Sequence, residues 1–379
     1  MKNMCYHGGQ FFEAIGPEFN ALERRNNIIN ADVLDAWYPP SLRVIAALQE
    51  DLPWLLRTSP PTGCEGMINA IARAREIPPE CVLPSAGSSD AIFLALRHWL
   101  NPSSRVLILD PMYGEYAHIL EQVIHCRVDR MVLSRKNGYR VDLGRLEMFL
   151  RRAYDLVILV NPNNPTGCHI PRSELQNIIS RAPATTRFWI DETYIEFAGA
   201  GESLEHFAAA NENIVICKSM SKVYALSGAR AAYLCGPKTL IEELRALTPP
   251  WAVSLLAQVA AVAALQDPEY YARRHQQTHQ LREQFAKELS EIVDWEILPG
   301  IANFVLCHLP ETGLNAAAVV ERCRAEGLFL RDLGAMGRSL GAHSLRIAIK
   351  DSKTNNKILG VLRRVIHFND FSRGVAMAR

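Results

Sequence analysis

Four short apolar runs, each followed at once by polar and aromatic residues, constrain the fold of this chain more than any other feature. The runs lie at residues 106–109, 156–160, 188–190 and 214–217. None of them alternates between apolar and polar residues, so both faces of each predicted strand are expected to be buried, as in a parallel sheet between helix layers. The intervening segments are long enough for crossover helices. The sequence therefore predicts a three-layer α/β domain with a mostly parallel central sheet.

The length of the chain indicates more than one domain. Its 379 residues exceed the size at which a single hydrophobic core keeps growing. We expect an N-terminal arm over residues 1–60 that forms part of the substrate pocket, and a large domain over residues 61–250. A linking helix and a smaller α+β domain, with apolar runs at 304–306 and 345–349, are expected over residues 251–379.

Charge and cysteine content argue against several classes of protein. The formal net charge is +1 and no block of like charges stands out, so no nucleic-acid or membrane-surface partner is predicted. The uncharged stretch 248–266 is flanked by prolines and is predicted to be a buried helix. Nine cysteines without a C-x-x-C pair indicate neither a disulfide framework nor a metal site. Since residues 1–9 contain no apolar signal region, a cytoplasmic protein is expected.

The residues that follow the four runs carry the chemistry. In an open parallel sheet, ligands bind beyond the carboxyl ends of the strands. Polar and aromatic groups delivered there by four strands are therefore expected to form one site. In chain order these segments are Asp110 to Tyr113, Asn161 to Gly167, Asp191 to Tyr194, and Lys218 to Lys222.

Two serine pairs suggest a place for a phosphate group. Ser88 and Ser89 precede an apolar helix predicted over residues 91–100, where they are either helix caps or a phosphate seat at the helix dipole. A second pair, Ser219 and Ser221, lies close in sequence to Arg230, and two hydroxyls with a guanidinium can hold a phosphate. Lys222, which follows this second pair directly, would be a nucleophile toward a carbonyl carbon if burial or nearby cations lowered its pKa.

The remaining strand-end residues suit an aromatic ring. Asp191 is either a strand-end turn residue or a carboxylate that keeps a pyridine nitrogen protonated. Tyr194 and Asn164 can then hydrogen-bond a ring hydroxyl, and Tyr113 can stack on the ring face. With Lys222 and the serines, these residues describe one planar, aromatic, phosphorylated ligand that bears an aldehyde.

From about residue 68 to residue 350, the chain resembles the fold type I pyridoxal-phosphate enzymes of the class I/II aminotransferase group. Within that group it is similar to histidinol-phosphate aminotransferases and threonine-phosphate decarboxylases, and its His7-Gly8-Gly9 start resembles the decarboxylases. The motifs that carry the resemblance are Asn161-Pro-Asn-Asn-Pro-Thr-Gly167, Asp191-Glu-Thr-Tyr194, Ser219-Met-Ser-Lys222 with Leu226-Ser-Gly-Ala-Arg230, and Ser344-Leu-Arg-Ile347.

The resemblance implies that pyridoxal 5′-phosphate is the cofactor and that the chemistry occurs at the α-carbon of an amino acid. It makes Lys222 the Schiff-base lysine and proton shuttle, and it pairs Asp191 with the pyridine nitrogen. Asn164 and Tyr194 would face the ring oxygen, while Tyr113 would stack on the ring. The cofactor phosphate would be held by Ser88, Ser89, Ser219, Ser221 and Arg230.

The resemblance also implies a substrate site and a homodimer. Arg346 would bind the substrate α-carboxylate as a bidentate fork, with Asn303 beside it. Arg331 matches a position that grips a distal anion, although it would otherwise read as a surface charge.

Two segments depart from the relatives. Where they carry an Asn-x-Asn-Pro-like loop, this chain has Leu34 to Pro39, and where they carry an Arg-Tyr-Pro turn it has Thr58-Ser59-Pro60. Asp35 in a pocket would favour a cationic substrate group; otherwise it caps a helix or pairs with a surface arginine. Trp37 and His7 complete the predicted substrate region.

Three reactions are compatible with these residues. The leading interpretation is an aminotransferase that uses Lys222 to move the α-proton. His7 and its glycines keep α-decarboxylation open, and Asp35 motivates elimination and cyclisation of a hydroxylated arginine-like amino acid. A non-catalytic protein that borrows the fold is disfavoured, because both Lys222 and Asp191 are present.

Overall fold

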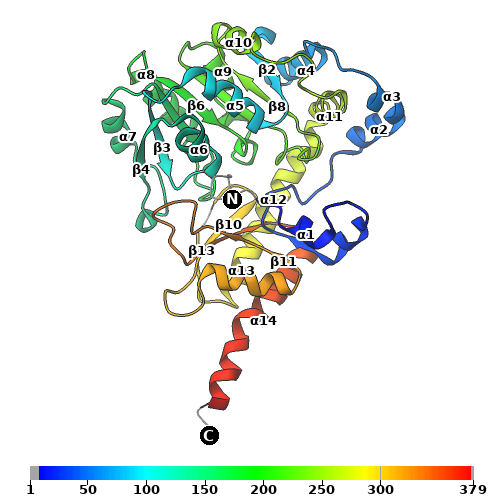
Figure 1. The fold of residues 1–379 in the computed structure, drawn as a ribbon, viewed down its shortest axis with the longest axis vertical. Helices are drawn as coiled ribbons and strands as arrows, with labels where there is room; N and C mark the ends of the chain where they lie inside the picture. Colours follow the sequence, from blue (N-terminus) through cyan, green and yellow to red (C-terminus); the bar gives the residue numbers. More distant parts are fainter. Residues whose placement is uncertain (1–7, 299, 377–379) are drawn as a thin grey trace.

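The computed structural model describes residues 8–298 and 300–376, which form a large and a small domain (Figure 1). A seven-stranded sheet is the centre of the large domain. Strand β8 is antiparallel to both of its neighbours, and the other strands run in one direction. In sheet order the strands are β2 (Val82–Ser85), β8 (Ala232–Cys235), β7 (Ile214–Ser219), β6 (Arg187–Asp191), β5 (Leu156–Val160), β3 (Arg105–Asp110) and β4 (Arg127–Val132).

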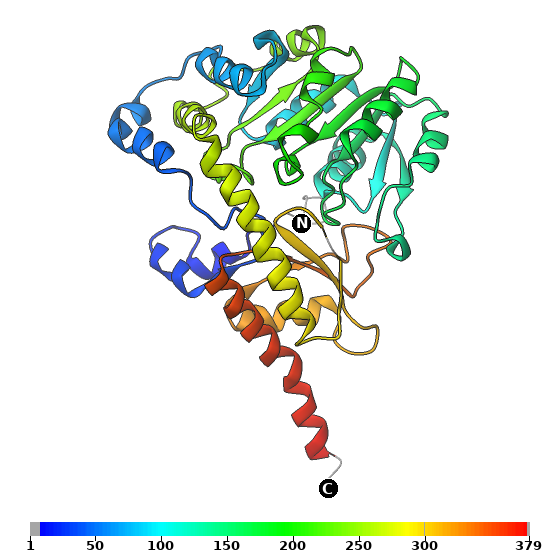
Figure 2. The ribbon, with the colours of Figure 1, turned by 180° about the vertical axis from the view of Figure 1, so that it is seen from behind.

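The four predicted apolar runs are strands β3, β5, β6 and β7, which lie side by side in the sheet. Every residue of β5 and β7 is buried, as expected for strands covered on both faces. The two opposite views each show helices over the sheet, so the three-layer prediction is confirmed (Figures 1 and 2). These helices are α4 (Glu65–Arg75), α5 (Ser88–Trp99), α6 (Gly114–His118), α7 (Leu143–Leu150), α8 (Arg172–Arg181), α9 (Glu205–Ala209) and α10 (Lys238–Arg245).

The small domain is the predicted α+β unit. Its antiparallel sheet has the order β12-β13-β10-β9, and the apolar runs at 304–306 and 345–349 form its two central strands. Helix α12 runs from the large domain down to this sheet (Figure 2). The elements are α12 (Pro268–Ser290), β9 (Glu296–Leu298), β10 (Phe304–His308), α13 (Ala316–Ala325), β12 (Arg331–Asp332), β13 (Ser344–Ala348) and α14 (Ser352–Ala376).

The N-terminal arm joins the two domains. Its strand β1 (Ile29–Asn30) pairs in parallel with β11 (Leu328–Phe329) of the small domain. Farther along, α2 (Leu42–Glu50) and α3 (Leu52–Arg57) pack on α11 (Leu255–Leu265). The chain between β1 and α2 therefore crosses from one domain to the other. This crossing segment, residues 31–38, includes most of the segment Leu34 to Pro39, for which the sequence predicts a departure from similar proteins.

The uncharged stretch near residue 250 forms helix α11, and most of its side chains are buried, as predicted. In the described residues, no helix is long and apolar enough to cross a membrane.

Candidate active site

One cavity at the carboxyl ends of the strands contains every residue predicted to hold the cofactor. Tyr113 follows β3, Asn164 follows β5, Asp191 ends β6, and Lys222 follows β7. The sheet order makes these strand ends neighbours, which brings together groups that are far apart in the sequence. The cavity is lined by Ser88, Ser89, Tyr113, Val160, Asn164, Asp191, Thr193, Tyr194, Ser219, Ser221, Lys222 and Arg230.

The hydroxyl and guanidinium groups lie at the start of helix α5. Ser88 and Ser89 form its first turn, where backbone N–H groups lack partners within the helix. Gly87 precedes them with φ +94°, and a Cβ at this position would lie 2.2 Å from Nη2 of Arg230. Glycine therefore lets the guanidinium approach the helix start. This cradle of hydroxyls, N–H groups and one cation fits a phosphate group.

Asp191 is buried and held in a fixed orientation. Its Oδ1 accepts hydrogen bonds from the backbone N–H and the hydroxyl of Thr193, at 2.9 and 2.6 Å. Its Oδ2 accepts one from the hydroxyl of Tyr116 at 2.9 Å, and Trp189 donates to that hydroxyl at 2.7 Å. Burial raises the pKa of Asp191 above its usual range, against the effect of these hydrogen bonds. A protonated ring nitrogen would be a fitting partner for this carboxyl group.

Lys222 lies where this cavity meets a second one. Its Nζ donates to Oδ1 of Asp35 at 2.9 Å and to Oγ of Ser227 at 3.4 Å. Three more residues line both cavities, namely Tyr113, Asn164 and Tyr194. A substrate in the second cavity is therefore within reach of the lysine and of the cofactor seat.

The second cavity contains the two predicted substrate arginines, Arg331 and Arg346. Arg346 is buried and donates to Oδ1 of Asn164 at 2.6 Å and to the backbone oxygen of Asp32 at 2.9 Å. Burial, followed by the nearby charge of Arg331, lowers the pKa of Arg346 to about 10. Arg331 forms a buried ion pair with Asp32, with Nε 2.8 Å from Oδ1. Arg331 is therefore buried, and the alternative prediction that it is a surface charge is wrong.

The other predicted substrate residues lie elsewhere. Asn303 is buried and donates to the backbone oxygen of Leu34 at 2.9 Å, which holds the crossing segment in place. Trp37 faces helix α12, where its Nε1 donates to Thr278 at 2.9 Å. Neither side chain lines the two cavities. His7 lies outside the described residues.

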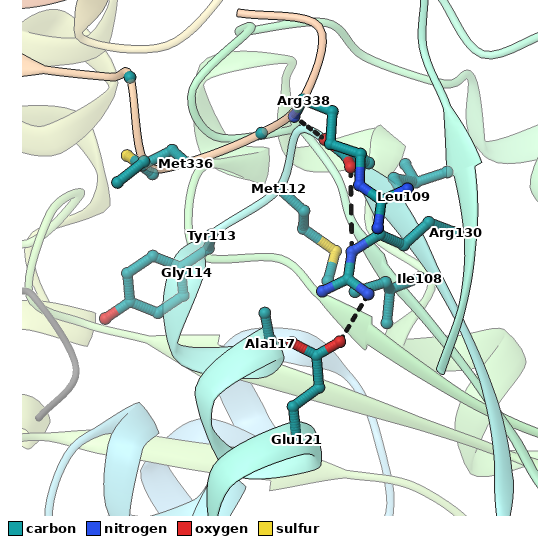
Figure 3. Close-up of a pocket in the computed structure, with 14 residues that line it drawn as sticks. Ile108, Leu109, Met112, Tyr113, Gly114, Ala117, Glu121, Arg130, Met336 and Arg338 are labelled. Atoms are coloured by element: carbon teal, nitrogen blue, oxygen red, sulfur yellow. Dashed lines mark hydrogen bonds and ion pairs between the residues drawn. The ribbon is translucent and has the colours of Figure 1, made fainter. Parts of the chain in front are cut away.

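A third cavity lies on the other side of Tyr113, between strand β3 and the loop 334–338 (Figure 3). Tyr113 and Met336 stand at one side of it, and Arg130 stands at the other, paired with Glu121 at 2.6 Å. Because Tyr113, Gly114 and Met336 also line the second cavity, the two spaces adjoin.

Sequence reasoning missed several residues of the site. Tyr116 and Thr193 donate hydrogen bonds to Asp191. Thr193 belongs to the predicted segment Asp191 to Tyr194, whereas Tyr116 lies three residues beyond the predicted segment that ends at Tyr113. Glu115 is buried and accepts hydrogen bonds from Tyr113 at 2.6 Å and Ser89 at 3.0 Å. Asp32 offered no signal, since its pairing with Arg331 depends on two distant segments of the chain.

The fold and the site define a pyridoxal-phosphate enzyme of fold type I: a lysine, a buried carboxyl group, two tyrosines, and four serines with one arginine line one cavity. The chain belongs to the class I and II aminotransferase family, whose model matches residues 32–362. The family depends on this cofactor, and the residues present fit it, so the sequence prediction of an aminotransferase of this family is confirmed.

Individual relatives agree with this family. A histidinol-phosphate aminotransferase of Staphylococcus saprophyticus is 32% identical over 71% of this chain and 75% of its own. One of Rhodopseudomonas palustris is 26% identical over 86% of this chain and 88% of its own. Among solved structures, the fold is shared with histidinol-phosphate aminotransferase of Sinorhizobium meliloti in complex with pyridoxal-5′-phosphate (TM-score 0.81, 21% identity, 97% of this chain and 99% of that one). It is also shared with L-threonine-O-3-phosphate decarboxylase of Porphyromonas gingivalis (TM-score 0.76, 22% identity, 88% and 98%).

Proposed function

We propose that the protein transaminates an α-amino acid whose free carboxylate is bound by Arg346, and that it releases the corresponding 2-oxo acid. The observation that carries this proposal is the guanidinium of Arg346 in the second cavity. Glu115, Lys222 and Arg331 also line this cavity, and Arg331 is paired with Asp32. Arg346, in contrast, donates to the neutral oxygens of the Asn164 side chain and the Asp32 backbone. Its one positive charge suits a carboxylate, with its one negative charge, better than a phosphate monoester, which carries about two at neutral pH.

The residues of this chain then have distinct tasks. Bound pyridoxal phosphate supplies an electron-withdrawing ring that stabilises negative charge at Cα. Asp191 keeps the ring nitrogen protonated, and Tyr113 covers the ring face. Arg346 orients the substrate through two parallel hydrogen bonds to its carboxylate. Lys222 would take the proton from Cα of the substrate and give it to the former aldehyde carbon of the cofactor.

The test is an amino-acid screen that measures both products and the absorbance of the bound cofactor. We expect a 2-oxo acid in step with loss of the amino acid, and no turnover in Lys222→Ala. Histidinol phosphate, the substrate in the names of the relatives, is the matched comparison and is expected to react more slowly. Turnover that releases carbon dioxide, or eliminates water with the nitrogen retained, would reject transamination.

We also propose a homodimer, which an exposed apolar surface supports. Helices α2 and α3, which pack on α11, expose Leu42, Trp54 and Leu56, and the segment that leads to α11 exposes Trp251. Ser59, at the predicted position of the missing turn tyrosine, lies just after α3. Sedimentation should show a dimer that Leu56→Glu weakens. A monomer at micromolar concentration would reject it.

We also propose that the protein is located in the cytoplasm. It is supported by the cysteines of the described chain, all eight of which are free thiols.

A further inference from the structure

The crossing segment places a carboxylate against the reactive lysine. Asp35 accepts a hydrogen bond from Nζ of Lys222 at 2.9 Å, and the two side chains are only partly exposed, at 37% and 19%. Asp35 comes from the arm, whereas Lys222 follows strand β7 of the large domain. The contact therefore joins two segments that lie 187 residues apart in the sequence.

A second lysine lies on the other side of Asp35. Lys350 follows strand β13 of the small domain, and its Nζ donates to the backbone oxygen of Asp35 at 3.3 Å. Burial lowers the pKa of Lys350 to about 8; the charge of Lys222 acts in the same direction, and Asp35 opposes both. Two lysines, one from each domain, thus contact Asp35: Lys222 contacts its carboxylate and Lys350 its backbone oxygen, and the charge of each lysine lowers the pKa of the Asp35 carboxyl group.

This arrangement has a consequence for a lysine that gains and loses a covalent bond. As the lysine that holds the cofactor, Lys222 would form a C=N bond to the aldehyde carbon, and the aldehyde oxygen would leave as water. A substrate amine that took over that carbon would release Lys222 as a free amine. The ability of Lys222 to balance Asp35 would therefore change in each cycle, whereas Lys350 would stay in place.

We propose that Asp35 is a positioning residue that holds the free amine of Lys222 beside the cofactor, and that Lys350 balances Asp35 while Lys222 is bonded to the cofactor. The inference rests on the proposed function for the return of Lys222 in each turnover. The titratable groups that act on this pair are Lys222 and Lys350 on Asp35, Asp351 on Lys350, and Tyr194, which the charge of Asp35 influences.

The proposal predicts opposite effects of two neutralising variants. The readout is the pH midpoint of the absorbance change of the bound cofactor, which reports protonation of its bond to Lys222. Removing a negative charge at this distance should lower the midpoint by about one pH unit, and removing a positive charge should raise it by a similar amount. We therefore expect a lower midpoint in Asp35→Asn and a higher one in Lys350→Met, while Asp35→Glu stays close to the wild type.

Matched controls separate this effect from net charge and from structural damage. Asp294→Asn and Lys353→Met make the same charge changes at exposed positions and should leave the midpoint unchanged. In single-turnover mixing, Asp35→Asn should slow the return of Lys222 to the cofactor about tenfold. Circular dichroism and cofactor titration show which variants fold and bind the cofactor.

Shifts of opposite sign in the two neutralising variants support the proposal. Shifts in the same direction, or none in either variant, overturn it. If Asp35→Asn does not fold, Lys350→Met alone decides, because an unchanged midpoint there also overturns the proposal. These measurements need only the bound cofactor, so they stay informative if no 2-oxo acid forms and the proposed function fails.

Discussion

Asp32→Asn tests whether the charge of the second cavity selects the substrate. The substitution keeps the size of the side chain and removes the negative charge that lies 2.8 Å from Arg331. Both partners are buried, and breaking a buried ion pair by removing one of its charges typically costs about 3–5 kcal/mol of stability. A ligand with one more negative charge can restore part of this loss.

The expected change in selectivity follows from these contacts. A hydrogen bond to a charged group contributes about 1.5–3 kcal/mol, and about 1.4 kcal/mol corresponds to a tenfold change in affinity. The ratio of kcat/KM for an O-phosphorylated amino acid to that for its unphosphorylated counterpart should therefore rise about tenfold to a hundredfold in Asp32→Asn. The assay is 2-oxo acid formation with both substrates.

Stability supplies an independent measurement for the same variant. Denaturant unfolding should show that Asp32→Asn is less stable than the wild type, and that the phosphorylated amino acid stabilises the variant more. Asp294→Asn, at an exposed position, is the matched control and should alter neither quantity. A folded Asp32→Asn protein with the wild-type selectivity ratio would refute the reasoning about cavity charge.

Three further predictions concern the cofactor cradle, the third cavity and the small domain. Gly87→Ala should weaken cofactor binding at least about tenfold, because the added Cβ would displace Arg230. Gly138→Ala is the control: Gly138 also has a positive φ, but open space surrounds it, so the binding constant should stay unchanged. Equal effects of the two substitutions would contradict this prediction. Met336 lines both the second and the third cavity, so a larger side chain there would narrow the passage between them. Met336→Trp should therefore lower kcat/KM about tenfold for amino acids with long side chains but not for alanine. Equal losses for both kinds of substrate would contradict this prediction. Burial lowers the pKa of His308 to about 4, so as the pH falls from about 6.5 to 4 the unfolded chain binds a proton that the folded protein does not. Stability should therefore fall over that window by about 2–3 kcal/mol more in the wild type than in His308→Gln, as measured by denaturant unfolding at each pH; identical pH profiles would contradict it.

The cofactor cavity could be predicted from the sequence because its residues follow strands. A parallel sheet brings strand ends to one edge whatever the details of packing, so Asn164, Asp191 and Lys222 were bound to be neighbours once the strands were recognised. The substrate cavity could not be predicted in the same way. Its contents depend on how the arm and the small domain approach the sheet, and no local pattern specifies the pairing of Asp32 with Arg331.

The crossing segment connects both domains beside the second cavity, which its residues Val33 and Leu34 line. Residues 31–38 are held by backbone and side-chain contacts to both domains: Ala31 accepts from Ala348, Leu34 from Asn303, and Tyr38 donates to Val223. The two carboxylates of this segment, Asp32 and Asp35, pair with different partners, Arg331 and Lys222. Both partners line the second cavity, so a change in this one short segment alters the charge beside two of its lining residues and leaves the strand ends that line the first cavity as they are.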